Sequence, residues 1–200
     1  MQVTAGAGPS PAAAARRAQV VAATLEVIAE AGYAEASFAR IAAHAGLSST
    51  RLISYHFASK EALIGACVEE VVGALGREVG RRLHAETTAS GRLRTYITAV
   101  VEFSDVHRRE MSALLQILLS GAWSTEVGPE PAAAPLEALL RDGQRSGEFR
   151  DFDPAVVAAA VQRSVEALPF RLAVQPDLDC AAWARELVEL FDRGTRRDPA

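Results

Sequence analysis

Apolar residues recur at helical spacing along most of the chain, and no stretch shows the two-residue period of a β-strand. One face of the first such segment carries Val20, Leu25, Val27 and Ile28. We expect this helix to begin between residues 11 and 16 and to end at Ala31, because Gly32 can adopt the positive φ that ends helices. Residues 1–14 are mostly Ala, Gly, Pro and polar residues, and they predict a disordered arm.

Serines divide the next part of the chain into three helices, since a serine oxygen can accept a backbone N–H of the first turn. The expected caps are Ser37 for the second helix, Ser48 or Ser49 for the third, and Ser59 for the fourth. These helices should end near His44, near Tyr55–His56 and at about His84. Gly46 separates the second helix from the third.

The remainder of the chain also has a helical pattern. A loop rich in Gly and Pro is expected over Gly121–Pro135. Asp153-Pro154 favours a helix start, and Pro169 should kink or shorten the helix that follows. The expected helices cover residues 90–107, 108–120, 135–146, 154–173 and a final segment from Asp177 or Asp179 to Gly194.

Charge is unevenly distributed along the chain. The whole chain has a net charge of −4, but residues 1–65 carry five basic and four acidic side chains, whereas residues 66–200 carry the other 16 basic and 21 acidic ones. This asymmetry indicates that the N-terminal part meets a polyanion.

Several classes of protein lack support in the sequence. The two cysteines, Cys67 and Cys180, fit no metal motif, and no apolar run of about 18 residues predicts a membrane span. No phosphate-binding loop or nucleophile motif occurs, so we expect neither an enzyme nor a cofactor. The absence of a signal peptide predicts a cytoplasmic protein. A helical interaction module without DNA binding is the other alternative.

Residues 38–55 contain the physical parts of a helix-turn-helix. Ile41 and Leu47 can pack inward from either side of the turn, while Ala42 lets the helices approach closely. The third helix then presents outward Ser49, Thr50, Arg51 and Ser54. These side chains can bond base edges or phosphates, and an arginine fork matches the two acceptors of guanine.

A longer string of residues resembles the DNA-binding domain of TetR-family regulators over roughly a quarter of the chain. It comprises Ala31-Gly32-Tyr33, Ser37-Phe38-Ala39-Arg40-Ile41-Ala42, Ala45-Gly46-Leu47-Ser48, Tyr55-His56-Phe57 and Ser59-Lys60-Glu61-Ala62-Leu63. The resemblance implies an all-α fold with a helix-turn-helix DNA-binding domain at 15–62 and an effector-binding and dimerisation domain at 63–200. It also implies a ligand-released repressor that binds a palindromic operator as a homodimer.

The resemblance assigns roles to individual residues. Ser37, Ser48, Tyr55, His56 and Lys60 would contact DNA, and most of these contacts would be to phosphate. Phe57 would belong to the core. Arg16 and Arg17 stay open between a disordered lead-in and phosphate contact.

The segment from Gly46 to Phe57 is one residue longer than the usual family spacing. One residue rotates a helix by about 100°. Either Thr50 with Arg51, or Arg51 with Ser54, would therefore face the bases.

The last two helices are expected to form the homodimer. Trp183, Leu187, Leu190 and Phe191 make one apolar stripe. A second stripe of small residues comprises Val157, Ala160, Val161, Ser164, Val165 and Leu168. The alternative is that both stripes belong to the core of one chain.

A pocket for an unidentified small-molecule effector should lie among the central helices, because such sites combine apolar walls with a few polar groups. The candidate ligand-binding residues are Phe103, His107, Met111, Leu115, Trp123, Arg163, Glu166 and Phe170.

Overall fold

The structure, a computed structural model, describes residues 10–123 and 134–197. The described residues form helices and no strand, and the only pairing of the β type among them is an isolated bridge between Phe149 and Arg196. The predicted all-α class is confirmed. Residues 1–9 of the expected arm and most of the expected Gly/Pro-rich loop lie outside the described residues.

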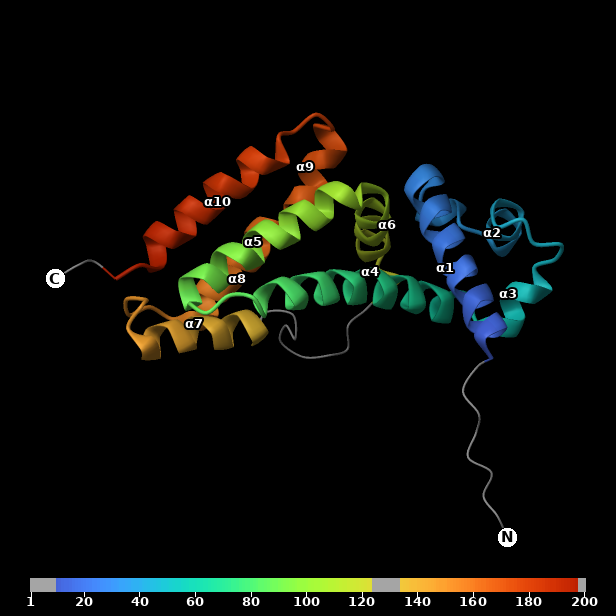
Figure 1. Ribbon diagram of the computed structural model, residues 1–200. Coiled ribbons are helices and arrows are strands. Elements are labelled where there is room, and N and C mark those ends of the chain that lie inside the picture. The colour runs from blue at the N-terminus through green and yellow to red at the C-terminus, as the bar shows by residue number, and fades with distance from the viewer. Residues whose placement is uncertain (1–9, 124–133, 198–200) are drawn as a thin grey trace, which may run out of the picture. The chain divides into compact units, whose positions relative to one another are not determined.

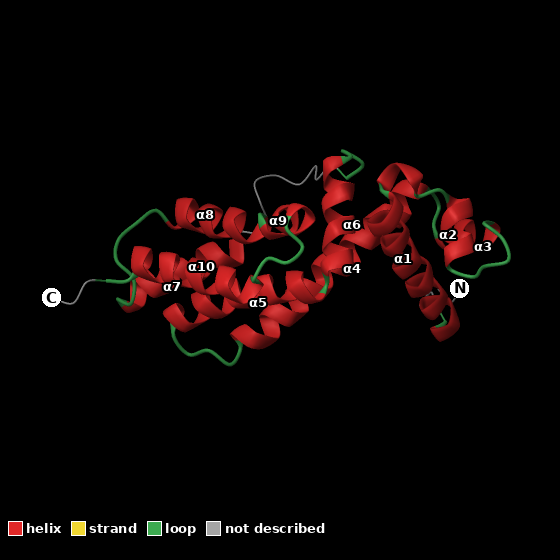
Figure 2. Cartoon of the chain, turned by 90° about the horizontal axis from the view of Figure 1, so that it is seen from above, coloured by secondary structure: helices red, strands yellow, loops and turns green. Residues whose placement is uncertain are grey.

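The chain divides into two compact units (Figures 1 and 2). Unit 1 comprises Met1–Val71 together with Ser112–Ser124, and unit 2 comprises Val72–Met111 together with Thr125–Ala200. Unit 1 is therefore discontinuous in sequence. Its second segment, Ser112–Ser124, lies in the second half of the chain.

Unit 1 contains four complete helical elements and parts of two others. They are α1 (Pro11–Ala31), the 3-10 turn η1 (Tyr33–Glu35), α2 (Phe38–His44), α3 (Arg51–His56), the first half of α4 (Lys60–Leu83) and most of α6 (Arg108–Leu119). The Ser10 hydroxyl accepts from the Ala13 N–H, and Pro11 occupies the first turn. Residues 11–14 are consequently helical, which corrects their assignment to the disordered arm.

The core of unit 1 surrounds the beginning of α4. Six consecutive residues of this helix, Leu63–Val68, are buried, which means that every side of the helix is covered there. Gly65 provides room for Trp123, whose Cζ3 would lie 3.1 Å from a Cβ at this position. The Cys67 thiol lies in the same core, and burial raises its pKa to about 12.

Unit 2 is built around α5 (Ala89–Val106). Helix α10 (Cys180–Thr195) packs along α5, and α7 (Ala134–Ser146) packs against α5 and α8 (Pro154–Glu166). The predicted break at Pro169 is confirmed, since α8 ends at Glu166 and the short α9 covers Leu168–Val174. The core of unit 2 includes Leu93, Ile97, Leu140, Val161 and Leu168.

The carboxylates of Glu148 and Asp192 both bind the beginning of α5. Glu148 accepts the backbone N–H groups of Ala89 and Ser90, each at 3.1 Å, and thereby caps α5 from a distant part of the chain. These bonds hold the pKa of the Glu148 carboxyl below its usual value. Asp192 accepts from the Ser90 hydroxyl at 3.0 Å and pairs with Arg94 at 2.8 Å. One end of α5 is therefore tied to both the α7–α8 turn and α10.

Candidate nucleic-acid interface and ligand pocket

The turn between α2 and α3 forms as the sequence predicts. The Ser37 hydroxyl accepts from the Arg40 N–H at 3.3 Å and caps α2. Gly46 has a φ of 64°, the left-handed conformation that glycine adopts without a steric penalty. The Leu47 N–H then donates to the Ala42 carbonyl at 2.8 Å, which reverses the chain toward α3.

Helix α3 has one buried and one exposed side. Ile53 is fully buried, and Phe57, directly after the helix, is 2% exposed. The exposed side of the helix carries Arg51, Ser54 and Tyr55, and the residues that lead into it, Ser48, Ser49 and Thr50, are exposed as well. The Ser49 hydroxyl accepts from the Arg51 N–H at 3.1 Å, while Thr50 is the N-cap residue by backbone position. Both pairs of base-facing candidates, Thr50 with Arg51 and Arg51 with Ser54, are thus accessible.

Side chains of α1 hold the ends of α2 and α3. The Arg17 guanidinium lies 4.2 Å from the centre of the Phe57 ring and donates to the His56 carbonyl at 3.2 Å. Arg16 donates to the Gln19 side chain at 2.7 Å, and the Gln19 amide donates to the Ala45 carbonyl at 2.8 Å. Both arginines are ordered on helix α1, so the lead-in alternative is wrong for them.

His56 ends α3 and Lys60 begins α4, and both residues are half-buried. The Lys60 ammonium sits 4.7 Å from the centre of the Tyr33 ring. Burial, followed by the charge of Glu61, raises the pKa of the Tyr33 hydroxyl. Ser59 caps α4 by accepting the Ala62 N–H at 3.2 Å, as predicted.

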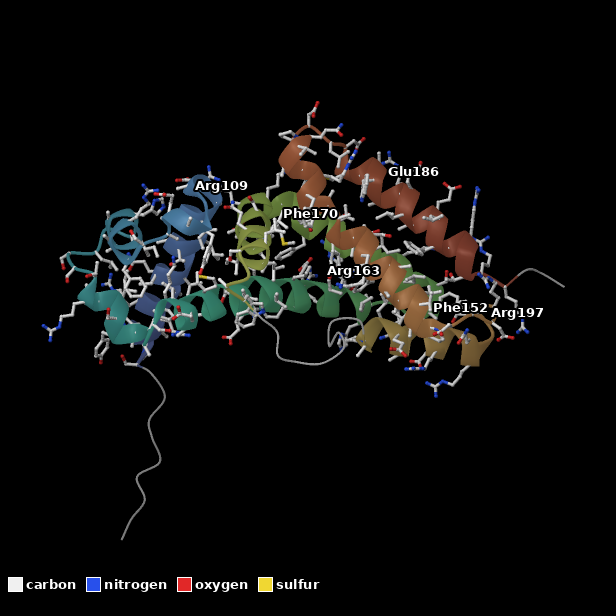
Figure 3. The ribbon with its side chains drawn as sticks, turned by 180° about the vertical axis from the view of Figure 1, so that it is seen from behind. Arg109, Phe152, Arg163, Phe170, Glu186 and Arg197 are labelled. Carbon is white, nitrogen blue, oxygen red and sulfur yellow. The ribbon has the colours of Figure 1, made fainter. Side chains whose placement is uncertain are left out.

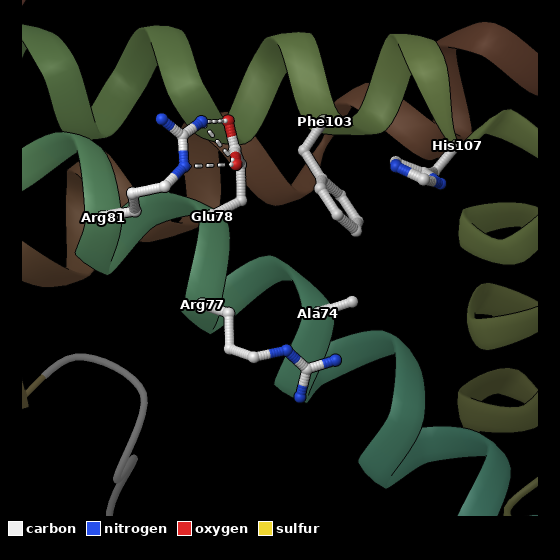
Figure 4. Close-up of a pocket in the computed structure, with 6 residues that line it drawn as sticks. All are labelled: Ala74, Arg77, Glu78, Arg81, Phe103 and His107. Atoms are coloured by element: carbon white, nitrogen blue, oxygen red, sulfur yellow. Dashed lines mark hydrogen bonds and ion pairs between the residues drawn. The ribbon is translucent and has the colours of Figure 1, made fainter.

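A pocket of about 350 Å³ opens between α4 and α5 in unit 2 (Figure 4). It is lined by Ala74, Arg77, Glu78, Arg81, Phe103 and His107. Phe103 is 7% exposed, and its ring stacks on that of His107 with 4.2 Å between ring centres. Phe103 and His107 are two of the eight residues proposed from the sequence for a ligand site, and the other six do not line this pocket.

Ion pairs organise the polar wall of this pocket. Glu78 accepts from Arg81 at 2.8 Å (Figure 4) and from Arg82 at 2.6 Å, and these bonds lower the pKa of the Glu78 carboxyl. Arg82 also pairs with Glu102 on α5. The wall is therefore ionised and held in place before any ligand arrives.

The other proposed ligand residues lie elsewhere. Met111 is buried, while Leu115 and Trp123 belong to unit 1. Glu166 bonds Gln162 at 2.5 Å and Arg163 at 2.9 Å on α8. The α4 residues that line the pocket were not among the ligand-binding residues predicted from the sequence. The available signal was the group Arg77, Arg81 and Arg82, whose helical spacing places them near one another.

The last helices expose an apolar set that matches the expected one only at Leu190, which is 61% exposed. Val161, Val165 and Leu168 are buried in the core of unit 2, as the intrachain alternative held. Trp183, Leu187 and Phe191 are only partly buried. The outward apolar side chains are Val156 on α8, Phe170 and Val174 on α9, and Leu190 on α10. Figure 3 shows Arg163 on α8 and Phe170 on α9.

Comparison with known proteins gives the family. Residues 20–67 match the family described as "Bacterial regulatory proteins, tetR family". The chain is 37% identical over 158 residues to the HTH-type transcriptional regulator BetI of Ectopseudomonas mendocina, which covers 76% of this chain and 77% of that protein. The chain belongs to the TetR family. The resemblance drawn from the sequence is confirmed, and with it the class of DNA-binding transcriptional regulator.

Other TetR-family relatives match over shorter segments. The chain is 39% identical over 87 residues to the regulator BetI 2 of Chromohalobacter salexigens, which is 44% of this chain but only 41% of that protein. The alignment thus spans less than half of that relative. None of the described helices is long and apolar enough to cross a membrane.

Solved structures share the fold. A tetR-family regulatory protein from Rhodococcus RHA1 superposes with a TM-score of 0.76 at 21% identity and covers 92% of this chain and 98% of its own. AibR, solved in complex with isovaleryl coenzyme A and operator DNA, gives a TM-score of 0.74 at 20% identity over 88% of this chain and 97% of its own. At these identities the likeness concerns the fold alone.

Proposed function

We propose that this TetR-family protein is a ligand-released repressor that binds a palindromic operator as a homodimer. The observation that carries the proposal is the two-sided character of α3. Its apolar residue Ile53 is fully buried, whereas Tyr55 is 81% exposed. A helix that exposes hydroxyl and guanidinium groups on a rigid support has the chemistry needed in a major groove.

Roles on the DNA follow from the chemistry of each side chain. Arg51 would read guanine through its forked donors, with Ser49, Thr50 and Ser54 beside it. The positioning contacts to phosphate would come from Ser37, Ser48, Tyr55, His56 and Lys60. The positive charge of Lys60 at the start of α4 adds to the partial positive charge of that helix terminus.

The homodimer would form through α8, α9 and α10. Four exposed apolar side chains support this interface: Val156, Phe170, Val174 and Leu190. Large exposed apolar groups on neighbouring elements favour association with another protein surface. A two-fold dimer would also present two α3 helices to successive major grooves, about 34–36 Å apart, which is the geometry of a palindrome.

Ligand control would act through unit 2. AibR, which shares the fold, binds isovaleryl coenzyme A as well as operator DNA. A ligand that binds one arrangement of the α4–α5 pocket better than another shifts the population toward it, and release of DNA follows if that arrangement binds the operator less well. We assign the protein no catalytic role and place it in the cytoplasm.

The first test is selection of bound fragments from random duplex DNA with the full-length protein at two salt concentrations. We expect enrichment of a palindrome with half-sites about one helical turn apart and weaker binding at high salt. Enrichment of no sequence by a folded dimer would contradict operator reading.

The dimer is tested by sedimentation of the Leu190→Asp and Val156→Asp variants. Leu190 is 61% exposed and Val156 is 65% exposed, so neither substitution should disturb the core. We expect monomers with weakened operator binding. Val72→Asp is the matched control, because Val72 is a half-exposed apolar residue on α4. Unchanged dimers in both variants would rule out this interface.

A further inference from the structure

Two adjoining pockets follow α4 and α5 in unit 2, and they share Arg81. The first is the 350 Å³ pocket next to Phe103. The second, of about 410 Å³, continues past Arg81 to Arg82, Arg94 and Thr95. Together they form an elongated polar site with an aromatic end.

Arginines outnumber carboxylates among the residues that line this site, and two of these arginines, Arg82 and Arg94, pair with Glu102 and Asp192 outside the lining. The lining contains four arginines, Arg77, Arg81, Arg82 and Arg94, but only two carboxylates, Glu78 and Glu86. The carboxylates are already bonded by the chain itself. Glu78 accepts from two of the arginines, and Glu86 accepts from the Thr95 hydroxyl at 2.8 Å.

Arg81 keeps donors for a further acceptor. It uses Nε and Nη2 toward Glu78, and Nη1 makes no bond in Figure 4. A guanidinium has five N–H donors in a fixed plane, and it binds a carboxylate through two of them. The Arg81 side chain is 70% exposed, so its remaining N–H groups are accessible from solvent, and the ion pair with Glu78 favours one orientation of the guanidinium.

The other end of the first pocket is aromatic, and its His107 ring also lies 3.6 Å from the Glu110 carboxylate. The stacked rings of Phe103 and His107 form one wall, and the Ala74 methyl group lies across from them (Figure 4). A flat ligand would bury its apolar surface there, while its charge reaches Arg81.

We propose that the α4–α5 pocket binds an organic carboxylate with an aromatic body, whose carboxylate contacts Arg81 and whose ring lies against Phe103. This assignment deepens the proposed function and rests on it, because it names the class of molecule that would release the operator. A cationic ligand finds no unbonded carboxylate on this wall, and a neutral ligand leaves the Arg81 donors unused.

The test uses three molecules of one shape: 2-naphthoate, 2-naphthalenemethanol and 2-naphthylmethylammonium. Calorimetric titration of the full-length protein should give at least tenfold tighter binding for the carboxylate than for the alcohol, and the weakest binding for the ammonium. Arg81→Gln should abolish this preference. Arg145→Gln should preserve it, since Arg145 is a surface arginine on α7 that lies outside both pockets.

Equal or tighter binding of the alcohol or the ammonium would overturn the assignment, as would binding of none of the three, or a preference that survives Arg81→Gln. Operator binding is measured on the same samples. A protein that binds no operator without ligand refutes the proposed function. A protein whose operator is released by the alcohol or the ammonium keeps ligand control but loses the carboxylate assignment.

A second inference concerns helix α1 and rests on different contacts. Arg17 covers Phe57 and binds the His56 carbonyl, and Gln19 binds the Ala45 carbonyl. These two carbonyls lie at the ends of α3 and α2. We infer that Arg17 and Gln19 are positioning residues that fix the rotation of α3 for reading the proposed operator.

Salt dependence distinguishes positioning from phosphate contact. Arg17→Gln should lower operator affinity at least tenfold, leave binding to random duplex unchanged and leave the slope of log K against log[salt] unchanged. Arg17→Lys should restore much of the affinity, because an ammonium can also bind a carbonyl and an aromatic face. Arg40→Gln, at an exposed arginine paired with Glu35, is the control for loss of one surface charge.

A slope reduced by about 1, with equal losses on operator and random DNA, would show a phosphate contact and overturn the positioning role. Unchanged operator affinity in Arg17→Gln would overturn it as well. If the unsubstituted protein selects no operator, the failure lies with the proposed function.

Discussion

The exposed side of α3 and the α4–α5 pocket use polar residues in opposite ways. On α3, hydroxyl groups and Arg51 point outward from a helix whose other side is anchored by Ile53. In the pocket, charged side chains bind one another, as in the pairs of Glu78 with Arg81 and Arg82. The first surface is held by apolar packing beneath it, and the second is held by ion pairs within it.

On α3, the residues that stabilise the fold and the residues that would contact DNA are different. In the α4–α5 pocket, the same charged residues bind one another and line the site. A polar residue on α3 can be replaced with little effect on folding, because it contributes nothing to the core. A charged residue in the pocket cannot be replaced without disturbing its partners. Substitutions should therefore show separable effects in the first region and coupled effects in the second.

The largest contrast is expected between two neighbouring aromatic residues. Phe57 is 2% exposed and Tyr55 is 81% exposed. Phe57→Ala should cost about 3–5 kcal/mol of stability, because it leaves a cavity beneath α3. Tyr55→Ala should stay within about 0.5 kcal/mol of the parent yet weaken DNA binding. Urea unfolding and operator titration test both, and comparable stability losses would break the contrast.

A glycine pair tests packing in unit 2. A Cβ at Gly143 would lie 2.2 Å from Cδ2 of the buried Phe149, whereas a Cβ at Gly76 meets nothing within 4 Å. Gly143→Ala should destabilise by roughly 1–3 kcal/mol through overpacking. Gly76→Ala should stabilise by roughly 0.5–1 kcal/mol, because alanine loses less backbone entropy in a helix. Thermal unfolding should shift in opposite directions, and a common direction would contradict this packing.

Arg51→Ala should affect recognition alone. We expect a loss of about 1–3 kcal/mol on the selected operator, with relaxed preference at one base pair. The melting temperature should not change, since Arg51 is exposed. Equal losses on all sequences would show that Arg51 contacts only phosphate.

The smallest effect concerns pH and Glu148. Backbone N–H groups lower the folded-state pKa of this carboxyl, so its charge stabilises the fold above the unfolded value, about 4.3. That contribution is lost as pH falls through the lower folded value. Glu148→Gln should cost about 1 kcal/mol at neutral pH, the scale of a helix cap.

The stability difference between Glu148→Gln and the parent should shrink as the pH of urea unfolding is lowered below about 4. Glu189→Gln, which removes one exposed i,i+4 pair with Arg193, is the control. An equal difference at every pH would show that the charge of Glu148 plays no part.

Local chemistry made unit 1 largely predictable from sequence. Ser37, Gly46 and Ser59 act within three or four residues of their own positions, and helical periodicity fixed the burial of Ile41. The Arg17 contact with His56 was not predictable, because 39 residues separate the partners. The residues around Arg17 in the sequence do not indicate that its guanidinium packs on the distant Phe57 ring.

The α4–α5 pocket of unit 2 also depends on contacts between residues that are far apart in sequence. Phe103 and His107 are four residues apart and could be paired by helical spacing. Their polar neighbours Glu78 and Arg81 come from another helix, and only tertiary packing brings the two sets together. The outward residues Val156 and Phe170 were missed on α8 and α9 because small apolar residues occupy most sides of that segment.

The discontinuity of unit 1 has a consequence for protein engineering. A chimera that grafts residues 15–62 onto another sensor would cut α4 just before its six buried residues and would omit the Ser112–Ser124 segment that carries Trp123. Such a graft should aggregate through its opened core. A transplant that carries residues 10–71 together with residues 108–123 keeps all described residues of unit 1, so the exchangeable module is defined by packing and not by the length of the sequence motif.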